Sequence, residues 1–184
     1  MRTVGCGFGI AVDAIVVSME AHSVLVRVAQ IMQRHKLEAI LIGNAAAALQ
    51  GAPVTTIDID FFFRRTPANV RKLKAIADEL EAVVLRPYYP VSGLWRIVRD
   101  LDGLQLDFMD AIHGIRSFEG LRRRATEANI GGARILVATL ADIIKSKKAA
   151  ARPQDLAVLP VLEKVLEQTT HDARRQTPES PRGK

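Results

Sequence analysis

Helical and strand-like hydrophobic patterns alternate along the chain. Apolar residues recur at helical spacing from Ala21 to His35, with basic side chains outside the apolar stripe. A second helix is predicted from Thr66-Pro67, because a capping hydroxyl followed by proline is a typical helix start. The capping-box pattern from Thr139 to Asp142 predicts a third helix, and Pro153 begins a final one.

The final helix should end where the sequence becomes polar. Its predicted inward positions are Leu156, Leu159, Leu162, Val165 and Leu166. The chain is polar from Thr169 onward and contains proline and arginine, which is typical of disorder. We therefore expect a loosely attached N-terminal extension over residues 1–18, one domain over residues 19–168, and a disordered basic tail over residues 169–184.

Short apolar runs between these helices predict strands. Two of them, Glu38–Ile42 and Thr56–Phe63, enclose a short alanine-rich helix, Ala45–Gln50, that Gly51 closes. Later segments are the strands Ala82–Leu85, Leu94–Val98 and Leu104–Met109, the short basic helix Phe118–Arg124, and a hairpin over Thr126–Val137 that turns at Gly131-Gly132. The fold class is therefore α/β, with a short mixed β-sheet, flanking helices and C-terminal helices beside it.

Two acids on the second strand carry the candidate chemistry. Asp58 and Asp60 lie at positions i and i+2, so both carboxylates project from one strand face, with Cα atoms about 6–7 Å apart. Carboxylates on one face repel each other unless a cation lies between them. Mg²⁺ accepts such oxygen ligands together with substrate phosphates. The pair therefore predicts a metal site.

A glycine turn precedes the acidic pair. Gly43-Asn44 follows the first strand and precedes the short helix. A strand–glycine–helix turn directs backbone N–H groups and the positive helix end toward a phosphate. The asparagine amide can also donate to a phosphate oxygen. We expect Gly43 and Asn44 to contact the phosphates of a nucleotide.

Gly43-Asn44, Gly51 and Asp58-Ile59-Asp60, in this order, resemble the nucleotidyltransferase superfamily that includes DNA polymerase β. The similarity is greatest to small bacterial minimal nucleotidyltransferases and to the related toxins of abortive-infection type E systems. It covers about Val24 to Leu162. Asn44 departs from the glycine or serine usual in that family.

The resemblance implies further site residues. A third acid on a later strand serves as general base or metal ligand in that superfamily, and Asp107 fits by order and by its apolar neighbours. Asp110 is the alternative, and we expect it on the opposite strand face. Lys147 and Arg152 resemble a late basic element at the nucleotide site, in which Arg152 pairs with Asp155. A solvent-exposed basic helix face is the competing interpretation of these two residues.

The resemblance also implies a reaction. A two-metal Mg²⁺ site formed by Asp58, Asp60 and Asp107 would support transfer of a nucleoside monophosphate from an NTP, such as ATP, to a hydroxyl. The implied acceptors are an RNA end such as that of tRNA, a partner protein or a small molecule, and a toxin–antitoxin role is also implied. The alternative is a catalytically inactive module that binds nucleotide or RNA.

Composition indicates which partners and which cellular compartment to expect. The net charge is +6 over 184 residues, which suits a polyanionic substrate but also a soluble basic surface. Arg116 and Arg122–Arg124 form a basic cluster with the same two interpretations. The single cysteine, Cys6, excludes an internal disulfide, so we expect a cytoplasmic protein. No apolar stretch is long enough to span a membrane, so no membrane partner is expected.

Overall fold

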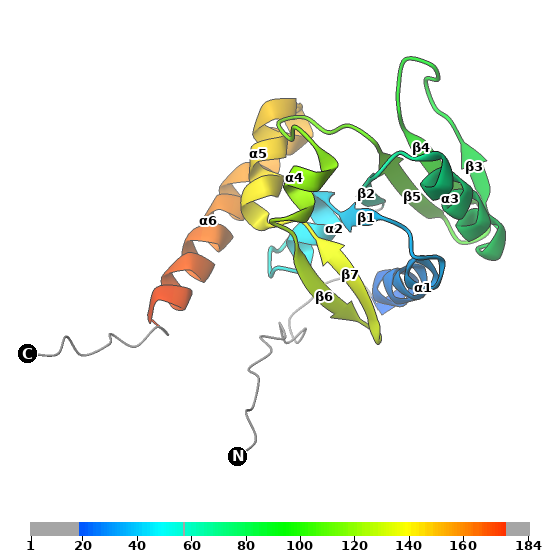
Figure 1. Ribbon diagram of the computed structural model, residues 1–184. Coiled ribbons are helices and arrows are strands. Elements are labelled where there is room, and N and C mark those ends of the chain that lie inside the picture. Colours follow the sequence, from blue (N-terminus) through cyan, green and yellow to red (C-terminus); the bar gives the residue numbers. More distant parts are fainter. Residues whose placement is uncertain (1–18, 57, 176–184) are drawn as a thin grey trace, which may run out of the picture.

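The computed structural model describes residues 19–56 and 58–175, and Figure 1 shows their arrangement. The strands are β1 (Ala39–Leu41), β2 (Ile59–Phe63), β3 (Val83–Leu85), β4 (Trp95–Arg99), β5 (Leu104–Met109), β6 (Thr126–Ile130) and β7 (Ala133–Val137). The helices are α1 (Met19–His35), α2 (Gly43–Ala48), α3 (Pro67–Glu79), α4 (Phe118–Arg122), α5 (Leu140–Ala150) and α6 (Pro153–Arg175). The predicted extension over residues 1–18 lies outside the described residues.

Over these residues the strands form one mixed sheet of seven strands, in the order β3-β4-β5-β2-β1-β7-β6. The pairs β2–β5 and β1–β7 are parallel, and the other neighbouring pairs are antiparallel. The fold class predicted from the sequence is confirmed. Residues far apart in the sequence become neighbours at the centre of the sheet, because β2 and β5 lie side by side.

Aromatic side chains fill the centre of the sheet. Phe61 on β2 stacks on Phe108 of β5, with ring centroids 4.9 Å apart, and Phe63 meets the same ring edge-on at 6.1 Å. All three rings are fully buried. Burying three phenylalanine side chains stabilises the fold by several kcal/mol, at roughly 1.5–3 kcal/mol for each side chain. This core therefore fixes β2 against β5, the two strands that carry the predicted acids.

Helix starts follow the capping signals in the sequence. The side-chain oxygens of Thr66, Ser117 and Thr139 each accept a hydrogen bond from a backbone N–H in the first turn of α3, α4 and α5. In Figure 1, α5 and α6 lie together on one side of the molecule, and α1 and α3 lie on the other. Across the described ranges, no helix combines the length and the apolarity needed to cross a membrane.

Two details of the predicted C-terminal region are wrong. Helix α6 continues to Arg175, so the chain is not disordered from Thr169. The hydroxyls of Thr169 and Thr170 donate to backbone carbonyls of the preceding helical turn, so both polar side chains are satisfied within the helix. Leu156, predicted to face inward, is 48% exposed. Residues 176–184 lie outside the described part of the chain.

The second predicted strand begins later than expected. Asp58 lies in a bend, and β2 starts at Ile59. The hydroxyl of Thr56 is 2.7 Å from the carbonyl oxygen of Asp58, a local hydrogen bond that competes with strand pairing. Asp58 therefore enters the site from a turn, and Asp60 enters it from the strand.

Candidate active site

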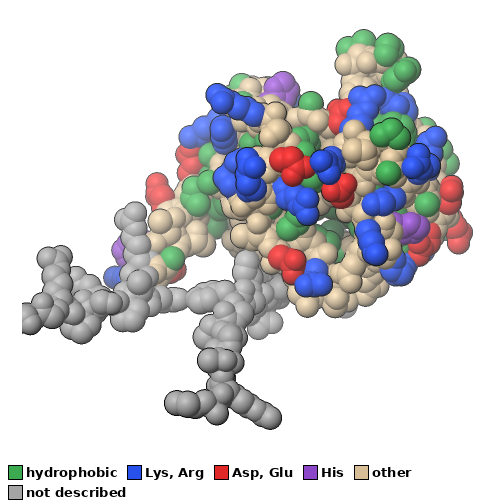
Figure 2. Space-filling model, in the orientation of Figure 1, with side chains coloured by type: hydrophobic (Ala, Val, Ile, Leu, Met, Phe, Trp, Pro, Cys, Tyr) green, Lys and Arg blue, Asp and Glu red, His purple; other side chains and the backbone are tan. Residues whose placement is uncertain are grey.

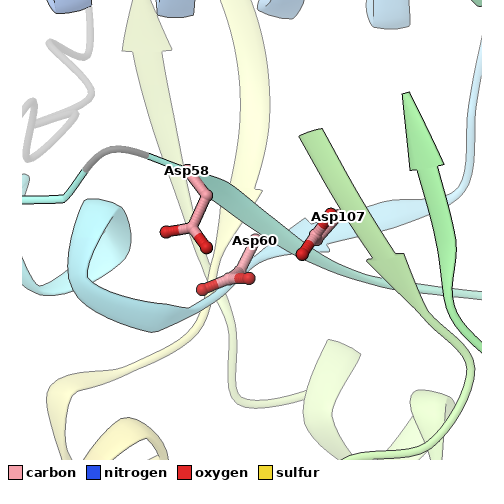
Figure 3. A group of neighbouring side chains, drawn as sticks. All are labelled: Asp58, Asp60 and Asp107. Carbon is pink, nitrogen blue, oxygen red and sulfur yellow. The ribbon is translucent and has the colours of Figure 1, made fainter. Parts of the chain in front are cut away.

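Three carboxylates converge at the centre of the sheet. Asp60 on β2 pairs directly with Asp107 on the parallel strand β5, and Asp58 precedes β2. One oxygen from each carboxylate can be chosen such that the three atoms all lie within 4.8 Å of one another. Figure 3 shows the three side chains turned toward a common space. This arrangement of hard oxygen ligands suits a divalent cation.

The electrostatics of Asp60 show the cost of this arrangement. Burial raises the pKa of Asp60 to about 7, and repulsion from Asp58 and Asp107 contributes. The nearby charges of Lys147 and Arg152 act in the opposite direction. The protein therefore holds together carboxylates that favour a shared positive charge.

Gly43 makes room for Asp60. Its φ of +69° is in the left-handed region, which favours glycine. A Cβ atom at this position would lie only 2.3 Å from Oδ2 of Asp60. The first residue of α2 and the second acid therefore fit together only when residue 43 lacks a side chain.

Asn44 lines the same pocket with an unpaired acceptor. Its side-chain Nδ2 donates to the backbone oxygen of Thr55 at 3.2 Å. Its Oδ1 is buried and has no hydrogen-bond partner within the described structure. Buried acceptors are usually satisfied, so this oxygen is suited to a donor from a ligand or a water molecule. The amide still has a second N–H, which is the donor predicted for a phosphate oxygen.

The third acid has a partner that the sequence did not suggest. Both oxygens of Asp107 accept hydrogen bonds from Arg96 on β4, at 2.7 Å from Nε and 2.6 Å from Nη2. Asp107 is only 5% exposed, so this bidentate pair offsets the cost of burying the carboxylate. The hydrogen bonds to Asp107 also raise the pKa of Arg96. Arg96 holds the Asp107 carboxylate in one orientation.

Lys147 and Arg152 share one buried acid. Lys147 Nζ is 3.0 Å from Oδ1 of Asp155, and Arg152 Nε is 2.6 Å from Oδ2. The expected Arg152–Asp155 pair is present. Asp155 is 2% exposed and fixes the start of α6 against the end of α5. Both basic side chains line the pocket that contains the acids, so they lie beside the site and not on a remote surface.

The pocket has a volume of about 650 Å³. The predicted residues Gly43, Asn44, Asp58, Asp60, Asp107, Lys147 and Arg152 all line it. Asp110 also lines it, so the expectation that Asp110 points to the opposite face is wrong. The chain leaves β5 at Met109, and the strand alternation no longer applies at residue 110. Asp110 is paired with Arg65 at 2.7 Å.

The predicted basic cluster is partly neutralised. Arg124 is paired with the buried Asp142 through three hydrogen bonds of 2.8–3.1 Å. Arg122 lies 3.9 Å from Glu38. Figure 2 shows acidic side chains among the basic ones on this face. These pairs favour a structural role for Arg124 over contact with an RNA backbone.

Comparisons with known proteins identify the family of this chain. The sequence profile of a family described as "Nucleotidyl transferase of unknown function (DUF2204)" matches residues 21–177. The chain belongs to this nucleotidyltransferase family. The family assignment makes the protein an enzyme of the nucleotidyltransferase class. No curated protein matches the sequence significantly.

Solved structures of this class share the fold. The antibiotic-resistance factor ANT(2'')-Ia is 14% identical, with a TM-score of 0.58 over 86% of this chain and 94% of its own. The lincosamide antibiotic adenylyltransferase LnuA, solved with lincomycin, is 13% identical, with a TM-score of 0.56 over 82% of this chain and 99% of its own. A candidate nucleotidyltransferase of Thermotoga maritima is 20% identical, with a TM-score of 0.55 over 84% and 97% of the two chains.

Metal-free stability should report the charge on Asp60. Because its folded-state pKa is raised to about 7, the folded protein keeps a proton that the unfolded chain loses above a pH of about 4. Stability should therefore fall as the pH rises from about 4 to about 7, by at most roughly 4 kcal/mol, since one pKa unit is worth about 1.4 kcal/mol. Asp60→Asn should remove this pH-dependent loss of stability. The free energy of unfolding is measured by urea unfolding in the presence of EDTA.

The matched control is Asp78→Asn, at an exposed position on α3. The difference in unfolding free energy between Asp60→Asn and the wild type should favour the variant more at pH 8 than at pH 5. A difference that is the same at both pH values would show that Asp60 is not held against its neighbours as described.

Substitution of Gly43 should weaken metal binding by more than the backbone strain of the substitution explains. Gly43→Ala and Gly51→Ala both place a side chain at positive φ, which costs about 1–2 kcal/mol. Only the new methyl group at residue 43 meets Asp60, since nothing lies within 4 Å of a Cβ at residue 51. Thermal unfolding with and without Mn²⁺ should show that Gly43→Ala alone loses the stabilisation by Mn²⁺. Equal loss in both variants would contradict the contact.

Proposed function

We propose that this nucleotidyltransferase uses Mg²⁺ to transfer a nucleoside monophosphate, with ATP as the first candidate donor, to a hydroxyl group of a small molecule. The acceptor oxygen forms a bond to the α-phosphorus, and the bond from that phosphorus to the bridging oxygen of pyrophosphate breaks. The observation that carries the proposal is the convergence of Asp58, Asp60 and Asp107 within one pocket.

The three acids are the proposed metal ligands. Their oxygens fit a divalent cation, and the pKa of Asp60 is raised by burial and by repulsion from Asp58 and Asp107, which a bound cation would relieve. Mg²⁺ at this site would neutralise phosphate charge and lower the barrier to attack at phosphorus. Asp107, oriented by Arg96, completes the ligand set at the end where the acceptor hydroxyl enters and is the proposed acceptor of its proton.

The nucleotide is proposed to bind between α2 and the α5–α6 junction. Gly43 leaves space beside Asp60, and the second N–H of Asn44 and its unpaired oxygen are available to the nucleotide. Lys147 and Arg152 line the same pocket and carry positive charge toward Asp60. These two basic groups are the proposed partners of the pyrophosphate leaving group.

A small-molecule acceptor is favoured over RNA or protein. One structural neighbour was solved with adenylyl-2''-tobramycin and another with lincomycin. On this chain, two arginines of the basic cluster form ion pairs with acidic residues, which weakens the case for RNA binding. A toxin–antitoxin role and a cytoplasmic location stay predictions from the sequence.

The rival function is a nucleotide-binding module without catalysis. Asn44, in place of the usual glycine or serine, is the feature that favours it. The intact acidic set favours the enzyme. Incubation of the protein with each α-labelled NTP, Mg²⁺, total RNA and a cell lysate separates the two. Label in a small-molecule product supports the proposal, and label in RNA or protein redirects it. Stabilisation by Mg²⁺-NTP without any labelled product supports the binding module.

Replacement of Asp107 should separate nucleotide binding from transfer. Asp107→Asn keeps the size of the side chain and removes its charge, so thermal stabilisation by Mg²⁺-ATP should persist while label transfer falls about 10²–10⁴-fold. Asp110→Asn is the matched control, since Asp110 lines the same pocket but is paired with Arg65. A larger loss in Asp110→Asn than in Asp107→Asn would transfer the role to Asp110.

A further inference from the structure

We propose that the sheet face carrying the three acids continues outward as an acceptor platform, which binds an uncharged small molecule with an apolar ring beside its reactive hydroxyl. The inference rests on the proposed function and adds the class of acceptor. Neither the family assignment nor the structural neighbours specify such a class for this chain.

The pairing of the strands extends the acidic row across the sheet. Asp60 pairs with Asp107, Asp107 pairs with Arg96 on β4, and Arg96 pairs with Leu85 on the edge strand β3. Directly paired residues project from the same face of a sheet. The pocket lining reaches Arg96, and Leu85 is the next residue outward in this row.

A second row lies beside the first. Val83 pairs with Val98, and Val98 pairs with Gln105. Val83 is 61% exposed and Leu85 is 43% exposed. Val98 and Gln105 on the same face are half-buried, whereas Ile97 on the opposite face is buried. Aliphatic side chains on an open edge strand expose apolar surface that natural sheets usually cover or replace with charge. This surface is continuous with the catalytic face.

The loop over residues 86–94, between β3 and β4, forms the wall of the platform. Val91, Ser92, Gly93 and Leu94 line the pocket. Figure 1 shows the loop projecting beyond the sheet, and Figure 2 shows hydrophobic side chains at its tip. Tyr88 and Val91 are strongly exposed there. The loop therefore joins the pocket to further apolar surface.

The base of this loop is held from two sides. The Arg86 guanidinium stacks on Trp95 at 3.9 Å and on Tyr89 at 4.5 Å. At the pocket side, Gly93 contacts Asp110 so closely that a Cβ would lie 1.9 Å from its Oδ1. Asp110 is in turn paired with Arg65. These contacts favour a preformed wall, which lowers the entropic cost of binding an acceptor.

The direction of the reaction places the acceptor at this end. Attack at the α-phosphorus is in line with departure of the pyrophosphate, so acceptor and leaving group occupy opposite ends of the site. Lys147 and Arg152 are the proposed partners of the leaving group. An acceptor hydroxyl therefore approaches from the side of Asp107 and Arg96, where the apolar platform begins.

The charges at this end determine the class of acceptor. Both nearby carboxylates are already paired, Asp107 with Arg96 and Asp110 with Arg65. Each carboxylate charge is balanced by its arginine, so these two pairs offer no net negative charge to attract an ammonium group. Leu85 and Val83 instead offer apolar contact. An uncharged ring bearing a hydroxyl matches this surface, and a polycationic acceptor such as tobramycin does not.

The test compares three hydroxyl compounds: phenyl β-D-glucopyranoside, methyl β-D-glucopyranoside and tobramycin. Saturation-transfer NMR titrations are run on the full chain with Mg²⁺ and a non-hydrolysable ATP analogue. The phenyl glucoside should bind about tenfold more tightly than the methyl glucoside, since burial of one ring is worth at least about 1.4 kcal/mol. Leu85→Ser should reduce the affinity for the phenyl glucoside to that for the methyl glucoside.

Two variants control for folding and for nonspecific apolar contact. Leu101→Ser removes a leucine that is 93% exposed in the β4–β5 turn, and it should leave the preference for the phenyl glucoside unchanged. Val83→Ser repeats the test at a second platform residue, should Leu85→Ser alter the melting temperature. Both platform variants should retain the wild-type stabilisation by Mg²⁺-ATP.

Equal affinity for the two glucosides, a preference for tobramycin, or a phenyl preference that survives both platform substitutions would overturn the platform. These outcomes are separate from failure of the proposed function. That failure would appear as the absence of a labelled small-molecule product when the wild-type protein is incubated with the α-labelled NTPs. A labelled small-molecule product without the phenyl preference rejects the platform alone.

Discussion

Repulsion among three carboxylates is the constraint on which the site depends. Parallel pairing of β2 and β5 places Asp60 beside Asp107, and the bend before β2 adds Asp58. The aromatic core of Phe61, Phe63 and Phe108 provides the burial energy that holds these strands together despite the repulsion. Burial, together with this repulsion, raises the pKa of Asp60. Three carboxylates held in this way suit a divalent cation.

The surrounding residues limit this repulsion without removing it. Arg96 pairs with Asp107 at one end of the pocket. Lys147 and Arg152 face Asp60 from the other end, but both are also tied to Asp155. The positive groups are thus fixed at the two ends, and the space between the three acids remains the most favourable position for added positive charge. In the proposed reaction, the nucleotide binds at the end of Lys147 and Arg152 and the acceptor at the end of Arg96.

Local signals in the sequence were enough to predict most of the elements and the pair Asp58 and Asp60, whereas Asp107 was predicted from the family resemblance. Capping residues such as Thr66 and Thr139 marked helix starts, and Gly131-Gly132 marked a two-residue turn that the pairing of Ile130 with Ala133 confirms. The end of α6 could not be predicted, because polar helix residues after Thr169 resemble a disordered tail. The direction of the Asp110 side chain depended on the exact residue at which β5 ends.

The partner of Asp107 could be predicted only from the register of the hairpin formed by β4 and β5. A turn made of Asp102-Gly103 alone would pair Asp107 with Val98, whereas the observed turn spans residues 100–103 and pairs it with Arg96. A shift of two residues preserves the alternation of faces but replaces an aliphatic neighbour with a cation. The length of the turn therefore decided whether Asp107 had a counter-ion, and the hydrophobic periodicity of the strands does not predict the length of the turn.

The most direct measurement is an anomalous difference map from crystals grown with Mn²⁺ and a non-hydrolysable ATP analogue. The account predicts a Mn²⁺ peak within coordination distance of oxygens from Asp58, Asp60 and Asp107, roughly 2.0–2.3 Å from each ligand atom. The triphosphate should extend toward Lys147 and Arg152. Clear density for the analogue with Mn²⁺ bound elsewhere, and none between the three carboxylates, would contradict the account.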